Sequence, residues 1–260
     1  MATVSPEVLD FNQQENIFNQ HEGASFWIGR VSVGNLVTQP QLYNPLLKFR
    51  GQVYVNELGF VGTENLDKLG RESDSDDNRS ALFAAVENQG IYEHQYEPKI
   101  IGSARLIVKD KTDNPLPIEN HFPEIFSEKS AIVEKSAEAS RYISRHPVKK
   151  IQRNISFLML SSLVGHSVEN DIENVYAMME KPLIKALGSV GLPMHTIGKP
   201  KQIDELNGEL YPVLFHPFEI AEKLVNENDV DASRLRKYVF YESGPKVSDR
   251  FVNSKHLGTR

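Results

Sequence analysis

Charged side chains occur in this sequence inside segments that are otherwise apolar. The run EASRYISR has the short length and the Tyr and Ile of a β-strand, yet it contains Glu138 and Arg141. Arg105 lies within a second strand-like run, and Arg50 lies within a helix-like one. An ionised group that is buried alone is costly, so buried charges occur in pairs. We therefore expect these residues to belong to one mutual network.

The acids that would complete the network lie in the loop RESDSDDNRS, where Asp74 and Asp77 are the candidates and Asp76 is interpreted as solvated. In a flat strand, Glu138 and Arg141 would point to opposite faces because they are three positions apart. They can share a site only if a β-bulge lies between them, and bulges are common beside active sites. The alternative interpretation is a solvated loop with charges on an edge strand.

The segments that would position these residues alternate irregularly between strand and helix. Strands are predicted at 25–33, 81–88, 99–110, 137–145, 173–179, 192–198 and 208–215, and helices at 39–60, 154–170, 181–191, 217–227 and 230–239. This order predicts an α/β (α+β mixed) fold with a mixed central sheet of about seven strands and helices on both faces. We expect a polar N-terminal arm over 1–23, a single domain over 24–241 and a flexible tail over 242–260.

The composition excludes several classes of protein. The 260 residues are 40% hydrophobic, which suits one sizeable core, and they include no Cys, which excludes disulfides and thiolate chemistry. The net charge of −6 disfavours nucleic-acid binding. No apolar run approaches the roughly 18 residues of a membrane span, and we expect no secretory signal in residues 1–18, which lack a basic segment followed by an apolar one. We expect a cytoplasmic protein, and the eight His residues form no metal-binding motif.

Four short motifs, in a fixed order over residues 48–145, resemble the acyl-homoserine-lactone synthase family. The first motif is Arg50 followed by the aromatic residues Tyr54 and Phe60, and the second is E-S-D-x-x-D, which matches at Asp74 and Asp77. The third is an arginine in the third strand, here Arg105. The fourth is E-x-S-R-aromatic, here Glu138, Ser140, Arg141 and Tyr142. Both this family and the related N-acyl amino acid synthases have the GNAT fold, so the resemblance implies a GNAT-like sheet that is splayed between strands 137–145 and 173–179.

The C-terminal half, residues 176–215, is more similar to the branch of N-acyl amino acid synthases and exosortase-associated acyltransferases. The shared features are Met179-Glu180, Gly191, Ile197-Gly198, and Gly208 with Pro212. Two positions depart from the expected patterns: Phe60 stands where lactone synthases usually have Trp, and Glu209-Leu210 stand where the second branch has an Arg before the Pro. We expect the chain to lie closest to the second branch.

Acyl transfer in this fold joins an amine to a thioester, so a base must take a proton from the amine. The resemblance makes Glu138 the candidate base, and a structural ion pair with an arginine is the alternative. Backbone N–H groups of the splayed strands would stabilise the tetrahedral intermediate. The predicted catalytic residues are Glu138, Arg141, Arg105, Asp74 and Asp77.

The acceptor pocket is expected between the first helix and the acidic loop. Arg50 would bind an amino-acid carboxylate through two N–H groups, and Tyr54 and Phe60 would enclose the acceptor side chain. Asp74 and Asp77 would either pair with arginines or bind the ammonium group, and the sequence leaves both roles open. The predicted substrate-binding residues are Arg50, Tyr54, Phe60 and Ser140.

The segment RHPVKKIQRN, residues 145–154, lacks the glycines with which coenzyme-A users of this fold bind pyrophosphate. Its basic residues instead predict a docking patch for an acidic acyl carrier protein, with a solvated helix start as the alternative. The patch consists of Arg145, Lys149, Lys150 and Arg153. Six apolar residues could contact the acyl chain: Phe157, Leu158, Met159, Leu160, Met178 and Met179. Taken one at a time, each is better interpreted as an ordinary residue of the hydrophobic core.

The sequence therefore predicts an N-acyltransferase that moves a fatty acyl group from acyl carrier protein to the amine of an amino acid or a related small molecule. No permanent cofactor is expected, since the acyl-phosphopantetheine of the carrier is a co-substrate. One alternative is an acyl-homoserine-lactone synthase that uses S-adenosylmethionine. A second is a GNAT-fold module that binds acyl carrier protein or a fatty acid without turnover.

Overall fold

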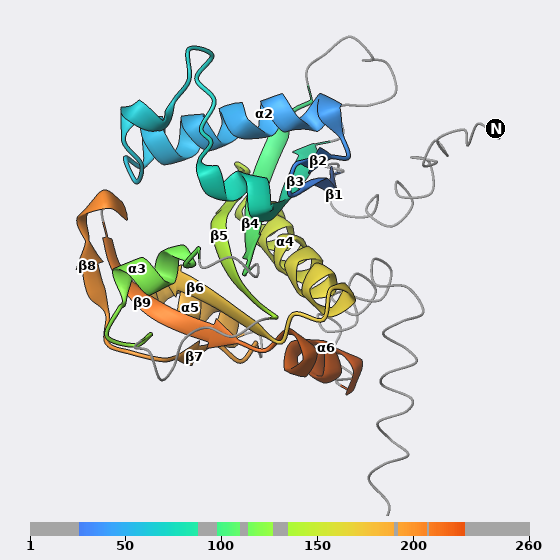
Figure 1. Ribbon diagram of the computed structural model, residues 1–260. Helices are drawn as coiled ribbons and strands as arrows, with labels where there is room; N and C mark the ends of the chain where they lie inside the picture. Colours follow the sequence, from blue (N-terminus) through green and yellow to red (C-terminus); the bar gives the residue numbers. More distant parts are fainter. Residues whose placement is uncertain are drawn as a thin grey trace, which may run out of the picture.

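A large, mainly antiparallel sheet organises the chain (Figure 1). The computed structural model describes residues 26–87, 98–109, 114–126, 135–189, 192–206 and 208–226. Within them the strands are β1 (Phe26–Val33), β2 (Leu36–Val37), β3 (Ser80–Glu87), β4 (Ile100–Val108), β5 (Ser136–Ser144), β6 (Asn174–Met179), β7 (His195–Thr196), β8 (Lys201–Ile203) and β9 (Gly208–Phe215). Their order is β2-β1-β3-β4-β5-β6-β9-β7, with β8 paired to β9. Only β5 and β6 run parallel to each other among these pairs.

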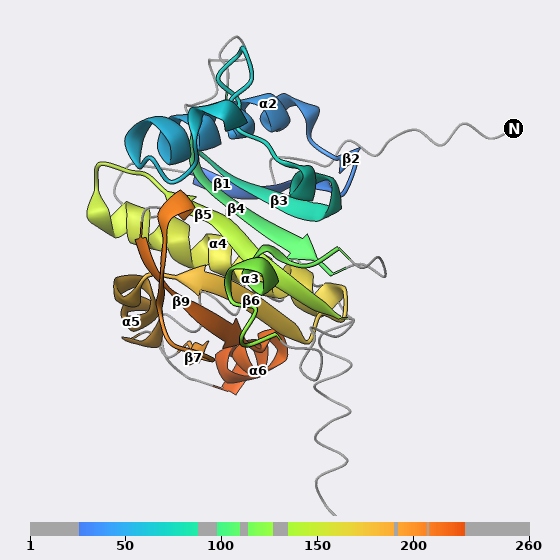
Figure 2. The ribbon, with the colours of Figure 1, turned by 60° about the vertical axis from the view of Figure 1, so that its left-hand side comes forward.

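Helices cover both faces of the sheet, as the sequence predicted. They are α2 (Pro40–Arg50), α3 (Pro117–His121), α4 (Lys149–Glu169), α5 (Lys181–Ser189) and α6 (Pro217–Asn226). Figure 2 shows α2 above strands β1, β3 and β4 and α4 below them. Alternate residues of β3 account for this arrangement: Leu82 and Ala84 pack toward α2, whereas Ala81 and Phe83 pack toward α4.

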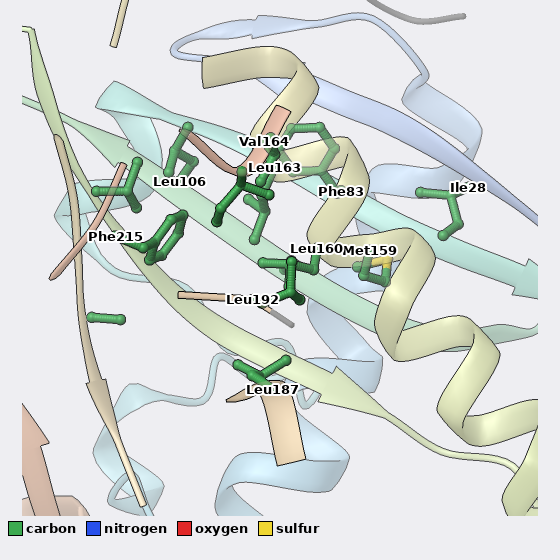
Figure 3. Packing of buried hydrophobic residues seen from close by; sticks show 14 of the residues in the cluster. Ile28, Phe83, Leu106, Met159, Leu160, Leu163, Val164, Leu187, Leu192 and Phe215 are labelled. Carbon is green, nitrogen blue, oxygen red and sulfur yellow. The ribbon is translucent and has the colours of Figure 1, made fainter. Parts of the chain in front are cut away.

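The main hydrophobic core lies between the sheet and α4. Figure 3 shows Met159, Leu160 and Leu163 of this helix among apolar residues of the strands, including Phe83 and Phe215. Each of these five side chains is at least nine-tenths buried. Two smaller clusters lie on the other face, one beneath α2 and one beneath α3. The described part of the chain contains no helix long and apolar enough to cross a membrane.

Strands β5 and β6 part halfway along their lengths. Within the described residues, their last parallel partners are Ala139 and Ala177, although β5 continues to Ser144. On their outer edges both strands remain paired, β5 with β4 and β6 with β9. The edges that face each other beyond these partners are therefore free of strand pairing, and the predicted splay between 137–145 and 173–179 is confirmed.

The structure corrects some of the predicted boundaries. Nine strands rather than about seven are present in the described residues, because the sequence did not predict β2 and β8, which are only two and three residues long. Helix α4 begins at Lys149 rather than at 154, since Ile151 and Ile155 are buried one turn apart and extend its apolar face toward the N-terminus. The predicted arm, the predicted tail and the predicted helix 230–239 lie outside the described residues.

The predicted helix over 39–60 is one continuous segment with two geometries. Helix α2 ends at Arg50, and a π-helix, η1, follows at Gly51–Glu57. A Cβ atom on Gly51 would collide with the carbonyl oxygen of Gly70, so only glycine allows the loop to approach the helix this closely. The backbone thus widens at the residues that face the acidic loop.

Candidate active site

Arg50 is a fully buried charge on the α2 face of the molecule. Its Nε donates a hydrogen bond to Glu72 Oε2 over 2.5 Å, and one terminal nitrogen donates to Asp77 Oδ1 over 2.9 Å. The side chain is fully buried, and its other terminal nitrogen has no hydrogen-bond partner among the described residues. Acids thus occupy two of the three guanidinium nitrogens and the third is buried, so Arg50 does not present the predicted pair of N–H groups to a substrate carboxylate.

Arg105 and Arg141 extend this contact into a larger group. Arg105 binds Asp74 Oδ1 at 2.5 Å and Asp77 Oδ1 at 3.0 Å. Arg141 binds Glu72 Oε1 at 2.8 Å and Asp74 Oδ2 at 3.2 Å. We call the resulting group the ion network, and its members are Arg50, Glu72, Asp74, Asp77, Arg105 and Arg141.

A β-bulge brings Arg141 into the ion network. Ser103 pairs with Ile143 and Arg105 pairs with Ser140, so two steps along β4 match three steps along β5. Arg141 lies in this bulge with a φ of 52°, in the left-handed region that residues other than glycine seldom adopt. The sequence predicted that Glu138 and Arg141 could share a site only if a β-bulge occurred in this strand. The structure contains that bulge.

The acidic loop is ordered by its own hydrogen bonds. Asp74 caps the 3₁₀ turn η3 (Ser75–Arg79), accepting from the backbone N–H of Asp76, and Asp77 Oδ2 accepts from the N–H of Asp74. The Asp76 carboxylate forms an ion pair with Arg79 at 2.6 Å, and Asp76 touches the ion network only through its backbone N–H, which bonds to Asp74, among the residues that the structure describes. The carboxylate is only 22% exposed, so it is less solvated than the sequence suggested.

The ion network keeps Glu72 and Asp74 ionised. Burial alone would raise the pKa of Glu72, but the charges and hydrogen bonds of Arg50 and Arg141 outweigh burial and hold that pKa below its ordinary value. Burial likewise opposes ionisation of Asp74, and Arg105 and Arg141 overcome it and lower the pKa of that carboxyl. These carboxylates are therefore poor candidates for proton transfer near neutral pH.

Glu138 has a different environment, although it lies only two residues from Ser140 on β5. Its side chain is buried, and Oε2 accepts a hydrogen bond of 2.7 Å from the backbone N–H of Ile118 in α3. Burial raises the pKa of Glu138 to about 8, even though this hydrogen bond and the charges of Arg105 and Arg141 act to lower it. No ion pair of Glu138 with an arginine is present among the described residues. Its hydrogen-bond partner is a backbone amide, rather than the arginine of the structural alternative.

Two aromatic residues flank the ion network. The guanidinium carbon of Arg141 lies 5.2 Å from the centre of the Tyr54 ring, and the Tyr54 and Phe60 ring centres are 6.2 Å apart. Burial raises the pKa of Tyr54 to about 12, so its hydroxyl stays protonated. Both aromatics predicted to bind substrate therefore lie together at the edge of the network. Ser140 accepts a hydrogen bond of 2.9 Å from Arg105 Nε, which places it there too.

The predicted carrier-binding residues follow directly after β5. Lys149, Lys150 and Arg153 lie in the first turns of α4 and are exposed. Arg145 is partly exposed and forms an ion pair with Glu57 of the π-helix at 3.4 Å. We call the surface formed by Arg145, Lys149, Lys150 and Arg153 the basic patch.

The residues suggested for the acyl chain do not form one group. Met159 and Met179 belong to the main core between the sheet and α4. Phe157 and Leu158 pack against the same core but are only partly buried. Met178 packs instead in the cluster beneath α3, on the other face of the sheet. Adjacent residues of a strand point to opposite faces, so Met178 and Met179 cannot both line one tunnel.

Glu72 is the network member that the sequence did not single out. It is fully buried and joins two arginines, Arg50 and Arg141. The available signal was its place at the head of the E-S-D-x-x-D motif, where only the two aspartates were treated as matches. Glu72 is held there by a backbone hydrogen bond of 3.0 Å from its own N–H to the carbonyl of Leu47 in α2.

The sequence model of the autoinducer synthase family matches residues 40–213, which include the whole ion network, Glu138 and the basic patch. This chain belongs to the autoinducer synthase family. No curated protein sequence matches the chain. The predicted family resemblance is thus confirmed, as is acyltransferase chemistry at the level of the family.

Solved structures agree on the fold. The acyl-homoserine-lactone synthase LasI aligns with a TM-score of 0.53 and 19% identity, covering 75% of this chain and 90% of LasI. BjaI, described as a CoA-dependent acyl-homoserine lactone synthase, aligns with a TM-score of 0.54 and 17% identity, covering 81% of this chain and 99% of BjaI. FeeM, an N-acyl amino acid synthase from uncultured soil microbes, aligns with a TM-score of only 0.37 and 11% identity, covering 53% of this chain and 68% of FeeM. The finer placement beside N-acyl amino acid synthases stays a prediction.

Proposed function

We propose that this chain is an N-acyltransferase that moves a fatty acyl group from acyl carrier protein to the amine of an amino acid or a related small molecule. The observation that carries the acyl-transfer part of the proposal is the environment of Glu138. A carboxyl that is buried, has no arginine partner among the described residues and has its pKa raised to about 8 is suited to accept a proton from an amine. A purely structural acid would be expected to sit within the ion network, as Glu72 does.

The proposed reaction places the thioester between β5 and β6, where the two strands part. The amine nitrogen attacks the thioester carbon, and N–H groups on the unpaired strand edges stabilise the oxygen that becomes negative. The C–N bond forms and the C–S bond breaks. Glu138, in its ionised form, takes the proton from the nitrogen directly or through a water molecule, and the phosphopantetheine sulfur leaves as the thiol after gaining a proton.

The carrier is proposed to be a protein because of the basic patch. Lys149, Lys150 and Arg153 are exposed cations on a chain whose net charge is −6, and acyl carrier proteins are acidic. Residues 145–154 also lack glycine, which the backbone needs for close approach to the pyrophosphate of coenzyme A. The name of BjaI records CoA dependence within similar folds, so acyl-CoA is the comparison substrate.

The acceptor would lie beside Tyr54 and Phe60, at the edge of the ion network. In the network, the number of arginines equals the number of acids, and each arginine binds at least one acid. A charge-balanced wall of this kind suits a small zwitterion better than a strongly charged acceptor. The terminal nitrogen of Arg50 that lacks a partner among the described residues is itself buried, so the proposed acceptor contacts do not include it.

The second candidate function is synthesis of acyl-homoserine lactone from S-adenosylmethionine. The family match over residues 40–213 favours it, as do the functions named for LasI and BjaI. Phe60 in place of the usual Trp favours a different acceptor. The two candidates share Glu138 and the thioester chemistry, and they differ only in the amine.

The test is thiol release from long-chain acyl carrier protein and from the matching acyl-CoA, each with a panel of amino acids and with S-adenosylmethionine. Release that requires one amino acid, and a product mass equal to that amino acid plus the acyl group, is the expected result. Release only with S-adenosylmethionine, with a lactone product, would assign the second function. Carrier binding without release from any amine would identify a non-catalytic binding module.

A further inference from the structure

The end of β5 contacts the π-helix at two points. Arg141, in the bulge, lies under the Tyr54 ring at 5.2 Å, and Arg145, just beyond the strand, pairs with Glu57 at 3.4 Å. Tyr54 and Glu57 are three residues apart in the same π-helix. One contact is therefore at the acceptor side of the site and the other is at the basic patch.

The two contacts differ in their access to water. Both side chains of the Arg145–Glu57 pair are about two-fifths exposed, at 41% and 42%, whereas the Arg141 side chain is 13% exposed. An ion pair that is this exposed is weak and exchanges readily. Glu57 also accepts a long hydrogen bond of 3.4 Å from Gln52 of the same helix, so it retains a polar contact when Arg145 leaves.

We propose that Glu57 determines the affinity for the carrier by competing with it for Arg145. This inference rests on the proposed function, because it needs an acidic carrier at the basic patch. An acid on the carrier surface would replace Glu57 on Arg145 and form a pair that is shielded from water at the new interface. Glu57 would then act as an internal substitute for the carrier, occupying Arg145 between turnovers and weakening every docking event.

The same exchange would release the last residue of the π-helix. Glu57 ends η1, and its neighbour Tyr54 lies on the arginine of the ion network. Carrier docking would thus free Glu57 as the thioester arrives, three residues from the aromatic ring that contacts Arg141. The acceptor side and the carrier side would be coupled through a single exposed ion pair.

The experiment measures the dissociation constant of unloaded acyl carrier protein for the full chain and four variants at low salt. Glu57→Gln is expected to tighten binding by about twofold to fivefold, the range for one exposed ion pair. In an Arg145→Gln background, Glu57→Gln is expected to have no effect. Glu173→Gln is the matched control, since Glu173 also loses one exposed ion pair, with Lys135 at 2.9 Å, at the opposite end of β5 and β6.

A thioester without a protein carrier separates the docking effect from a change in the site. With acyl-pantetheine, which has neither the carrier surface nor a phosphate, Glu57→Gln is expected to leave KM unchanged. The aspartate of Glu57→Asp is too short for the 3.4 Å contact, so this variant is expected to have the same KM for acyl-pantetheine as Glu57→Gln. Equal thermal melting curves would show that each variant is folded.

Some outcomes would overturn the inference while leaving the proposed function intact. They are equal carrier affinity in wild type and Glu57→Gln, the same tightening in the Arg145→Gln background, or the same tightening in Glu173→Gln. An equal change in KM for acyl-pantetheine would also overturn it. If the wild type binds no acyl carrier protein but turns over acyl-CoA, both the inference and the proposed carrier are wrong.

Discussion

The two faces of the central sheet are stabilised by different kinds of interaction, although the same strands supply both. On β4, Arg105 enters the ion network beneath α2, while its neighbours Ala104 and Leu106 join the apolar core over α4. The α4 face depends on volume, because apolar side chains of similar size can replace one another. The α2 face depends on charge balance and on the direction of each N–H group, so replacement there should be far less tolerant.

This contrast indicates which face of the sheet can hold a site for a polar substrate. The polar groups of the α4 face that the structure describes include the Tyr142 hydroxyl, which bonds to the backbone of the helix itself, whereas the α2 face contains the ionised groups and hydrogen-bond donors that a polar substrate needs. Glu138 lies on that second face and points toward α3. Five predictions test the comparison, beginning with the largest expected effect.

Glu138→Gln is expected to lower kcat by about 10²–10⁴-fold, because the amide cannot accept the proton of the attacking amine. The amide can still accept the hydrogen bond from Ile118, so the fold should be retained. Thiol release under saturating acyl donor measures the effect. Ser136→Ala, at a buried position of the same strand, is the matched control and should retain activity. Activity of Glu138→Gln within threefold of wild type would exclude the proposed base.

The same substitution is expected to change the pH dependence of stability. Burial raises the pKa of Glu138 to about 8 from an ordinary value of 4.5, so the folded state binds a proton that the unfolded state releases between these pH values. Glu138 therefore favours folding fully below pH 4.5, and this contribution is lost as pH rises through about 8. Urea unfolding from pH 5 to pH 9 should show Glu138→Gln gaining stability relative to wild type across that window. Parallel curves would contradict the raised pKa.

Arg50→Met is expected to lower the free energy of unfolding by about 3–5 kcal/mol, since it leaves the buried acids with one uncompensated charge. Glu72 and Asp77 each lose one partner. The charge-balanced double variant Arg50→Met/Glu72→Gln should cost less than the sum of the single variants. Denaturant unfolding measures all three proteins. A decrease in the free energy of unfolding below about 1 kcal/mol is what an exposed ion pair would give. That result would mean that water solvates the acids that Arg50 leaves unpaired.

Met159→Ala, on the α4 face, is expected to lower the free energy of unfolding by about 2–5 kcal/mol through the cavity that it leaves in the core. Met159 is fully buried in the main cluster. Met159→Leu should cost less than about 1.5 kcal/mol because it conserves volume. Arg50→Lys, which conserves charge but loses the planar geometry, should be tolerated less well than Met159→Leu. The reverse order of these two conservative changes would break the comparison between the faces.

Tyr142→Phe is expected to have the smallest effect, about 0.5–1.5 kcal/mol, because it removes one hydrogen bond. The Tyr142 hydroxyl donates to the backbone carbonyl of Ser156, and Ser144 contacts the hydroxyl of the same serine at 2.7 Å. These contacts attach the bulged half of β5 to α4. Thermal unfolding measures the loss. Tyr43→Phe, at a partly buried tyrosine of α2, is the control.

Much of the site could be predicted because its residues break local rules. Arg50, Arg105 and Glu138 are charges within apolar segments, and such positions require partners. The bulge at Arg141 could be stated only as a condition, since one residue of register depends on how β4 and β5 pair. The sequence did not distinguish Glu72 from other acids of the loop. Its place in the network depends on the hydrogen bond from its N–H to the carbonyl of Leu47 in α2.

Other features depend on contacts that a sequence pattern does not contain. The π-helix begins at Gly51, which lies against the backbone of Gly70, and this contact between separate parts of the chain is not visible in a sequence pattern. The placement of Met178 and Met179 on opposite faces is different, because the strand period alone could have predicted it. Helix α4 extended past its predicted start because buried isoleucines, rather than the basic residues around them, decide where the helix packs.

The parting of β5 and β6 also has a consequence for hydrogen exchange. Beyond Ala139, the amides on the β6-facing edge of β5 lack a neighbouring strand, so they should exchange with solvent by local fluctuation. The amides on its β4-facing edge should require much larger openings. One strand would thus exchange at two rates, and an acyl thioester bound between the strands would slow the faster of them.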